Sequence, residues 1–208
     1  MKIKRPVHLI FICISNRVRS PFAEFLFPKM MREWDERLVD KVKVSSAGFI
    51  SQKLRDRLAK VHVSFPDPFY NRFMAETTQG ALLKKGITVP DEWKSKELSP
   101  EMVEDADLLI TALPEQQEEL VNLYPRDRFK IFTTREMSRW EEYLIFEDFG
   151  VCPMDNTFWN YVEENPDYVS KVISAMEETL IRAFPNILKQ LGIRERGKRK
   201  SQSFGSPA

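Results

Sequence analysis

The sequence predicts an α/β fold with three layers, in which a four-stranded parallel sheet carries helices on both faces. Two observations lead to this prediction. Short apolar runs typical of buried strands alternate along the chain with segments of helical periodicity. Helical connections between successive strands favour right-handed crossovers between parallel strands. In such sheets a ligand binds at the carboxyl ends of the strands, where the strand order reverses. The loop after the first strand is therefore a candidate site.

The expected strands share an apolar, partly β-branched composition. They cover residues 7–12, 42–46, 108–112 and 129–133, and the last gives the weakest pattern. Ala47 and Gly48 close the second strand. Helical periodicity covers residues 21–38, 73–85, 114–124 and 166–191, and a short helix follows the capping pair Ser99-Pro100. Gly86 is expected to end the second of these helices.

The first and last helices carry apolar stripes that should face the sheet. These stripes are Phe22, Phe25, Leu26, Met30 and Trp34 in the first helix, and Val169, Val172, Ile173, Met176, Leu180, Ile181, Phe184 and Ile187 in the last. Each helix also contains a proline. We expect Pro28 to kink the first helix and Pro185 to break or bend the last.

The passage 49–71 is charged and rich in aromatic residues but has no clean period. We interpret it as an insertion with one short helix, within a single domain that spans residues 1–193. Its aromatic part, residues 65–73, is either a lid over the candidate site or a hydrophobic patch added to the body. The basic tail, residues 194–208, is expected to be disordered and solvated.

Composition excludes several functional classes. The chain has 208 residues, is 42% hydrophobic and carries a formal net charge of +1. This balance creates no global field that would recruit nucleic acid or an anionic membrane. No run of eighteen apolar residues and no signal peptide is present, so we expect a soluble, cytoplasmic protein. Two cysteines and two histidines are too few for a disulfide framework or a structural zinc site. We expect no metal and no cofactor.

The first strand runs directly into the segment CISNRVRSP, residues 13–21. Cys13 ends the strand and Arg19 follows six positions later, while Ser20 and Pro21 are suited to capping and starting a helix. Backbone N–H groups of the loop and the helix dipole would hold a tetrahedral oxyanion, and the guanidinium would bind two of its oxygens. The same surroundings favour the thiolate of Cys13. This arrangement indicates nucleophilic attack on phosphorus, although a cysteine ending a strand is often only a small buried hydrophobe.

Four segments together resemble the low-molecular-weight protein tyrosine phosphatase family. They are CISNRVRSP after the first strand, VSSAG at 44–48, ALLKKGI at 81–87 and ADLLITA at 106–112. They keep the family's order and, with the last helix, span residues 6–190. Other cysteine phosphatases carry the cysteine-arginine loop late in the chain, whereas here it lies near the N-terminus.

The resemblance implies a phosphomonoester hydrolase, most typically a protein-tyrosine phosphatase, that works through a phosphocysteine intermediate. Cys13 would be the nucleophile and Arg19 would bind the phosphoryl oxygens. Asn16 would support the loop, Ser20 would donate to the thiolate, and Ser46 would belong to the surrounding hydrogen-bond network. The implied phosphate-binding residues are Ile14, Ser15, Asn16, Arg17, Val18, Arg19 and Ser20. The substrate would be a phosphorylated protein or a small phosphomonoester, with inorganic phosphate as product.

The family also uses an aspartic acid on a late loop, in the pattern Asp-Pro-Tyr or Asp-Pro-Phe, to protonate the leaving oxygen. Asp67, in Asp-Pro-Phe-Tyr, copies that pattern. Asp155 lies in the expected place, shortly before the last helix, and we prefer it for that reason. However, Asn156 and Thr157 replace the proline and the aromatic residue of the pattern. The general acid therefore remains a choice between Asp155 and Asp67, and the substrate is not fixed by the resemblance.

Three further alternatives stay open. Cys152 is either a buried hydrophobe or a resolving thiol that captures an oxidised Cys13. An arsenate reductase on the same fold would use more cysteines than this chain has. A non-catalytic protein would bind phosphate or a phosphoprotein in the loop without turning it over.

Overall fold

The computed structural model describes residues 5–139 and 165–193. Its sheet contains β1 (Val7–Cys13), β2 (Val42–Gly48), β3 (Leu108–Thr111) and β4 (Ile131–Thr133). The strands are all parallel and lie in the order β2-β1-β3-β4. The predicted four-stranded parallel sheet is confirmed. The chain leaves β1 on one side toward β2 and returns on the other side to β3, so the strand order reverses at the carboxyl end of β1.

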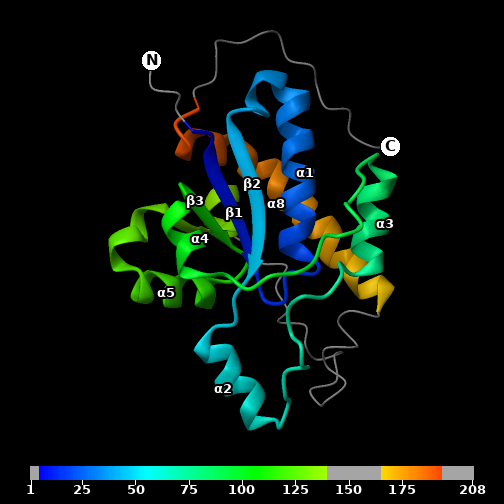
Figure 1. Cartoon of the computed structure of the whole chain (residues 1–208), viewed down its shortest axis with the longest axis vertical. Helices are drawn as coiled ribbons and strands as arrows, with labels where there is room; N and C mark the ends of the chain where they lie inside the picture. The colour runs from blue at the N-terminus through cyan, green and yellow to red at the C-terminus, as the bar shows by residue number, and fades with distance from the viewer. Residues whose placement is uncertain (1–4, 140–164, 194–208) are drawn as a thin grey trace.

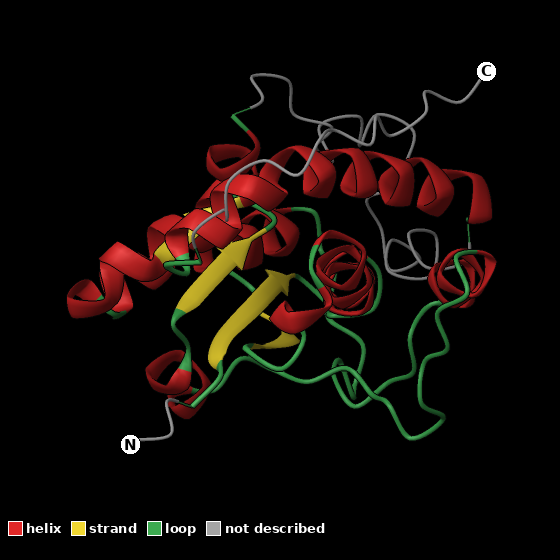
Figure 2. Cartoon of the chain, turned by 90° about the horizontal axis from the view of Figure 1, so that it is seen from above, coloured by secondary structure: helices red, strands yellow, loops and turns green. Residues whose placement is uncertain are grey.

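Helices cover both faces of this sheet, as Figures 1 and 2 show. They are α1 (Arg19–Trp34), η1 (Glu36–Leu38), α2 (Gln52–Lys60), α3 (Glu76–Lys84), α4 (Pro100–Asp105), α5 (Pro114–Leu123), η2 (Pro125–Lys130), α6 (Thr134–Ser138) and α8 (Pro166–Gln190). In Figure 1, α1 and α3 lie to one side of the strands, α4 and α5 lie to the other, and α8 passes behind the strands. Among the described residues, no helix is both long and apolar enough to cross a bilayer.

Alternate side chains of β1 serve the two faces, as the pleat of a strand requires. Leu9 and Phe11 belong to the larger core, which is completed by α1, α3 and α8. Ile10 and Ile12 belong to the core on the opposite face, under α4 and α5. All four side chains are at most 1% exposed. β1 is therefore the fixed centre of the sheet, and whatever follows its last residue starts from a rigid position.

Helix α1 begins two residues earlier than the sequence predicts. Arg19 is its first residue, so Ser20 lies inside the first turn, and its predicted role as N-cap is wrong. Pro21 is tolerated in this turn because the backbone N–H that it lacks belongs to the donors that no intrahelical carbonyl accepts. The hydroxyl of Ser20 instead faces the loop that precedes the helix.

The predicted apolar stripes are only partly correct. Trp34 is 49% exposed and contacts the ring of Phe184 at 5.8 Å on the rim of the core. Ile181 is 58% exposed, because one step along a helix turns a side chain by about 100°, away from the buried neighbour Leu180. Pro185 does not break α8, which continues to Gln190. The residues of α1 that are buried are Ser20, Pro21, Phe22, Ala23, Leu26, Phe27 and Met31.

Two element boundaries also differ from prediction. Helix α3 starts at Glu76 and not at residue 73, because Phe73 and Ala75 use their backbone groups to bind Arg17 in the candidate loop. Strand β4 starts at Ile131, since η2 occupies the residues before it. Gly86 follows α3 with a φ of +72°, the left-handed conformation expected of a helix-ending glycine.

The segment 49–71 contains one short helix, α2, as expected for it. In Figure 1 this helix lies beyond the carboxyl end of β2. Leu54, Leu58 and Val63 form a small core of their own with Ile14 and Leu113, and Phe65 and Phe69 pack against it. Ile14 belongs to the candidate loop and Leu113 follows β3. The segment is therefore packed against the end of the sheet where the candidate site lies.

Candidate active site

Cys13 is the last residue of β1 and is 2% exposed. The loop that follows it is held from outside through its carbonyl oxygens. Cys13 O accepts from Phe49 N at 2.8 Å, Arg17 O from Ala75 N at 3.1 Å, and Ile14 O from the Tyr70 hydroxyl at 3.1 Å. In a trans peptide the next N–H points opposite to the carbonyl. Outward carbonyls therefore turn the following N–H groups toward the inside of the loop, where an anion would bind.

Asn16 fixes the turn of this loop. Its φ is +55°, in the left-handed region that asparagine tolerates better than most residues. The side chain is fully buried, and its amide nitrogen donates to Ser20 Oγ at 2.9 Å and to Ser46 Oγ at 2.6 Å. Its oxygen accepts from the backbone N–H of Lys96 at 3.0 Å. These contacts connect the loop to α1, to β2 and to the segment before α4.

Ser20 Oγ donates to Cys13 Sγ at 3.0 Å, and Ala47 O is the more distant acceptor at 3.3 Å. The same oxygen accepts from the Asn16 amide, so its proton points away from that amide, and the sulfur is the nearer acceptor. A donor directed at sulfur stabilises the thiolate relative to the thiol. The early start of α1 is what brings this hydroxyl to Cys13.

Arg19, the first residue of α1, follows the loop. Burial lowers the pKa of its guanidinium from the usual value, while the negative charges of Cys13, Tyr168 and Glu115 oppose that shift. The usual arginine pKa lies so far above neutrality that the guanidinium stays charged. A thiolate, inward N–H groups and a fixed cation together can hold a tetrahedral oxyanion against sulfur.

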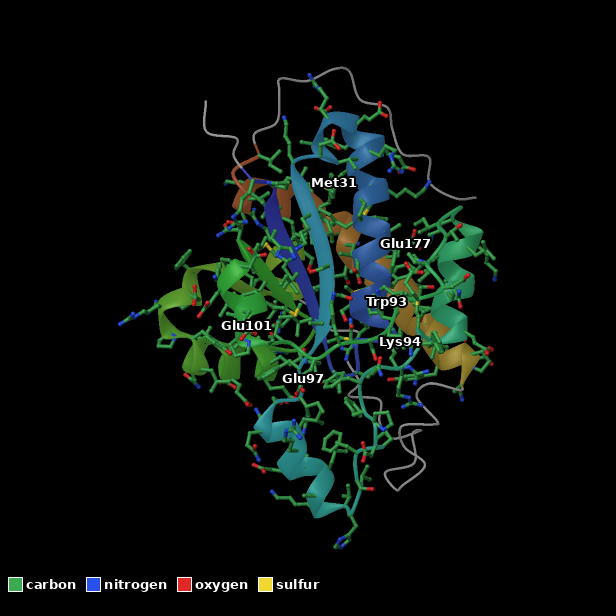
Figure 3. All side chains as sticks on the ribbon, in the orientation of Figure 1. Met31, Trp93, Lys94, Glu97, Glu101 and Glu177 are labelled. Carbon is green, nitrogen blue, oxygen red and sulfur yellow. The ribbon has the colours of Figure 1, made fainter. Side chains whose placement is uncertain are left out.

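Glu24 closes the network behind the loop. It accepts from Ser46 Oγ at 2.6 Å and from Trp93 Nε1 at 3.3 Å. Burial raises the pKa of this carboxyl above its usual range, and the Ser46 hydrogen bond, the charge of Lys96 and the Trp93 hydrogen bond only partly offset the effect. Hydrogen bonds thus run from Glu24 through Ser46, Asn16 and Ser20 to the sulfur. Figure 3 shows Trp93 near the end of α1 that follows the loop.

The raised pKa of Glu24 predicts a pH-dependent stability. The unfolded chain ionises this group near its ordinary pKa of 4.5, whereas the folded chain retains the proton to higher pH. Folding therefore binds protons, and stability falls as pH rises through that window. Glu24→Gln, which keeps an acceptor oxygen but does not titrate, removes this dependence. Urea unfolding from about pH 4 to about pH 8 should show wild type losing stability relative to the variant. If the free energy of unfolding of wild type minus that of Glu24→Gln stayed constant or rose with pH, the raised pKa of Glu24 would be contradicted.

The structure brings together most of the site residues that the sequence predicts: Cys13, the loop residues 14–18, Arg19, Ser20 and Ser46. Asp155 and Cys152 lie outside the described residues. Asp67 is exposed in the segment that packs beside the loop. Within residues 5–139 and 165–193, no group of three or more histidine, cysteine or carboxylate side chains gathers as a metal site would require.

Sequence reasoning missed two residues that contact the site network. Glu24 lies four residues after Ser20, one helical turn along α1. This spacing places both residues on the same face of the helix and could have identified Glu24 from the sequence. Tyr70 comes from the segment without periodicity, and only its place beside an aspartate-proline pair drew attention to it.

Comparisons with known proteins agree with this geometry. A family model described as low molecular weight phosphotyrosine protein phosphatase matches residues 8–65, which include the whole loop. A protein-arginine-phosphatase of Bacillus subtilis (strain 168) is 28% identical over 142 residues, or 68% of this chain and 79% of that protein. Two solved structures from Bacillus subtilis, a YwlE mutant and a low molecular weight protein tyrosine phosphatase, are each 26% identical. Their TM-scores are 0.58 and 0.57, over 88% of this chain and 99% and 98% of theirs.

The chain resembles the low-molecular-weight phosphotyrosine protein phosphatase family, whose model matches residues 8–65 and whose solved structures share its fold. The resemblance drawn from the four sequence segments is thereby confirmed, and the protein is a hydrolase of the phosphatase type. The names of its relatives state two different substrates, arginine in one and tyrosine in another. The resemblance indicates the class of reaction, and the choice of phosphorylated side chain has to be argued from the residues around the loop.

Proposed function

We propose that this chain dephosphorylates phosphoproteins, with phosphotyrosine as its main substrate, through a phosphocysteine intermediate on Cys13. The observation that carries the proposal is the sulfur at the end of β1, 3.0 Å from the Ser20 hydroxyl and facing a loop whose carbonyls are tied outward. A thiolate held in this way has an anion site directly beside it. The family's phosphatase chemistry supplies the reaction that such a nucleophile performs.

The reaction takes two steps. The Cys13 thiolate attacks phosphorus, so an S–P bond forms while the P–O bond to the tyrosine breaks, and the general acid gives its proton to the leaving oxygen. Water then attacks phosphorus, the S–P bond breaks, and the same carboxylate takes a proton from the water. Inorganic phosphate leaves and the thiolate is restored. Arg19 and the inward N–H groups bind the non-bridging oxygens throughout and stabilise the charge of both transition states.

Aromatic side chains beside the loop favour phosphotyrosine. Phe65, Phe69 and Tyr70 form edge-to-face pairs at 5.3 and 5.0 Å, and they pack next to Ile14 of the loop. An aryl ester gains from such neighbours. Arg17 adds a cation within the loop, held by a 2.7 Å hydrogen bond from its Nε to Phe73 O. That charge disfavours a leaving group that is itself a guanidinium.

Phosphoarginine is the second candidate, because the curated relative in Bacillus subtilis is a protein-arginine-phosphatase. Two peptides of one sequence, carrying either phosphotyrosine or phosphoarginine, separate the candidates when phosphate release is measured without metal. We expect a higher kcat/KM for the phosphotyrosine peptide. If the charge of Arg17 contributes to substrate choice, the variant Arg17→Thr should bring the kcat/KM values for the two peptides closer together. A higher kcat/KM for the phosphoarginine peptide would overturn phosphotyrosine as the main substrate, while the proposed phosphatase activity would stand.

The general acid is tested by a matched pair of variants. Asp155→Asn should lower kcat by roughly 10²- to 10⁴-fold, because the leaving phenolate then departs without a proton. The effect should shrink for substrates whose leaving groups are more acidic, since these need less protonation. Asp67→Asn, at the exposed aspartate of the competing pattern, should leave kcat unchanged. Steady-state kinetics on an aryl phosphate gives both results, and a damaging Asp67→Asn beside a silent Asp155→Asn would reverse the assignment.

A further inference from the structure

We propose that Tyr70 is a positioning residue of the phosphate-binding loop, which holds the Ile14 carbonyl outward and thereby directs the Ser15 N–H at the phosphoryl oxygens. The inference rests on the proposed function, because it assigns a role within that anion site. Tyr70 belongs to the segment 49–71, which the sequence left as either a lid or a hydrophobic patch. The contacts of Tyr70 assign part of that segment a third role, as an outer support of the loop.

The hydrogen bond between Tyr70 and Ile14 fixes the orientation of one peptide of the loop. The Tyr70 hydroxyl donates to Ile14 O at 3.1 Å. The peptide that joins Ile14 to Ser15 is planar, so a carbonyl directed at Tyr70 places the Ser15 N–H on the opposite side. The neighbouring peptide is held in the same sense, since Phe49 N donates to Cys13 O at 2.8 Å. Two consecutive peptides are thus oriented from outside the loop by residues that follow β2.

Gly48 makes this approach possible. A Cβ at this position would lie 2.7 Å from Ile14 O and would collide with the ring of Tyr70. The last residue of β2 therefore leaves room for the tyrosine ring and the loop carbonyl together. Gly48 is itself fixed, because its N–H donates to Lys96 O at 2.8 Å and its carbonyl accepts from Leu98 N at 2.8 Å. The ring lies against backbone that cannot easily move away.

The segment that carries Tyr70 is anchored on both sides. Arg57 of α2 pairs with Glu115 of α5 at 2.7 Å, and the backbone N–H of Gln52 donates to Glu119 of the same helix. After Tyr70, the N–H of Asn71 donates to Ser95 O at 2.8 Å. An anchored support can hold a peptide in one orientation, which a loose flap cannot.

Tyr70 also keeps its proton at neutral pH. Burial raises the pKa of its hydroxyl above the usual range, and the negative charges of Glu97 and Cys13 raise it further. Figure 3 shows Glu97 between the end of β2 and α2. The hydroxyl therefore remains a donor to Ile14 O at neutral pH.

The variant Tyr70→Phe tests the inference, because it keeps the aromatic ring and removes only the donor. A role as an apolar wall predicts no change, whereas a positioning role predicts weaker binding of small anions that never touch the ring. By isothermal titration calorimetry we expect vanadate, which mimics the transition state, to bind roughly tenfold more weakly. Inorganic phosphate should bind roughly threefold more weakly, since the ground state depends less on each N–H.

Tyr124→Phe is the matched control. Tyr124 follows the last residue of α5, is half-buried, and lies at the end of that helix remote from the loop. We expect it to bind both anions as wild type does, and both variants to melt within about 2 °C of wild type. Amide NMR gives a readout that does not depend on stability. Adding phosphate should shift the Ser15 N–H resonance strongly in wild type and weakly in Tyr70→Phe, with the Arg19 N–H shift retained.

The possible results separate the positioning role of Tyr70 from the proposed phosphatase function. Wild-type affinities and an unchanged Ser15 response in Tyr70→Phe would overturn the positioning role and leave the proposed function intact. A wild-type protein that binds neither vanadate nor phosphate would overturn the proposed function together with this inference. A loss of anion affinity in Tyr124→Phe equal to that in Tyr70→Phe would also overturn the inference, because the loss would then not come from the loop contact.

Discussion

Cys13→Ser is expected to lower kcat for aryl phosphates and phosphopeptides by at least ~10⁴-fold, the largest effect of any single substitution in this chain. The serine hydroxyl is a far weaker nucleophile than a thiolate, which needs no base to activate it. Among the described residues, the sulfur accepts a hydrogen bond from Ser20, which acts there as a donor and not as a base.

The same variant should still bind the anion. The inward N–H groups depend on hydrogen bonds from Phe49, Tyr70 and Ala75 to loop carbonyls, and none of these hydrogen bonds uses the sulfur. Inorganic phosphate should therefore bind to Cys13→Ser within about tenfold of its wild-type affinity. Equal turnover by wild type and Cys13→Ser would exclude Cys13 as the nucleophile. A variant that neither turns over nor binds phosphate would instead place Cys13 in the support of the loop.

Arg19→Lys is the second substitution with a large expected effect, a fall in kcat of roughly 10²- to 10³-fold. A guanidinium presents two parallel N–H donors to two phosphoryl oxygens, whereas a lysine ammonium contacts them as a point charge. The position is also partly buried, and burial already lowers the pKa of Arg19 there. The loss should be greater in kcat than in KM, because charge on the equatorial oxygens is greatest in the transition state.

Arg32→Lys serves as the control for Arg19→Lys. Arg32 is exposed in the last turn of the same helix, at the end opposite the loop. Its substitution should change neither kcat nor KM beyond experimental error. If Arg19→Lys behaved like Arg32→Lys, the guanidinium of residue 19 would have no part in binding the phosphoryl group, and the cation of the site would have to be Arg17.

The sequence predicted the sheet and the loop for physical reasons that act locally. The apolar run before Cys13 is buried on both faces of the sheet, and such a run allows few other structures. Asn16, Ser20 and Ser46 were assigned through the family resemblance, and their mutual contacts at 2.6 to 2.9 Å have the connectivity that this assignment implies.

Contacts between distant segments were not predictable in the same way. Tyr70 reaches Ile14 across 56 residues of chain, and the space for its ring depends on a glycine in a third segment. No period or spacing in residues 49–71 encodes that arrangement. The wrong prediction of Ser20 as an N-cap has a similar origin. Serine is a residue type favoured at helix N-caps, but in the structure its hydroxyl donates to Cys13. Asp155 and Cys152 lie outside the described residues, so their roles stay predictions.

Rapid acid quenching of the protein during turnover, followed by mass spectrometry of its peptides, tests the central claim most directly. The account predicts one phosphoryl group bound covalently to sulfur on the peptide that contains Cys13, formed and lost at rates consistent with kcat. The same peptide from Cys13→Ser should carry no such group on this time scale. Turnover of a phosphotyrosine peptide without any phosphorylated Cys13, or with the phosphoryl group on another residue, would contradict the phosphocysteine mechanism.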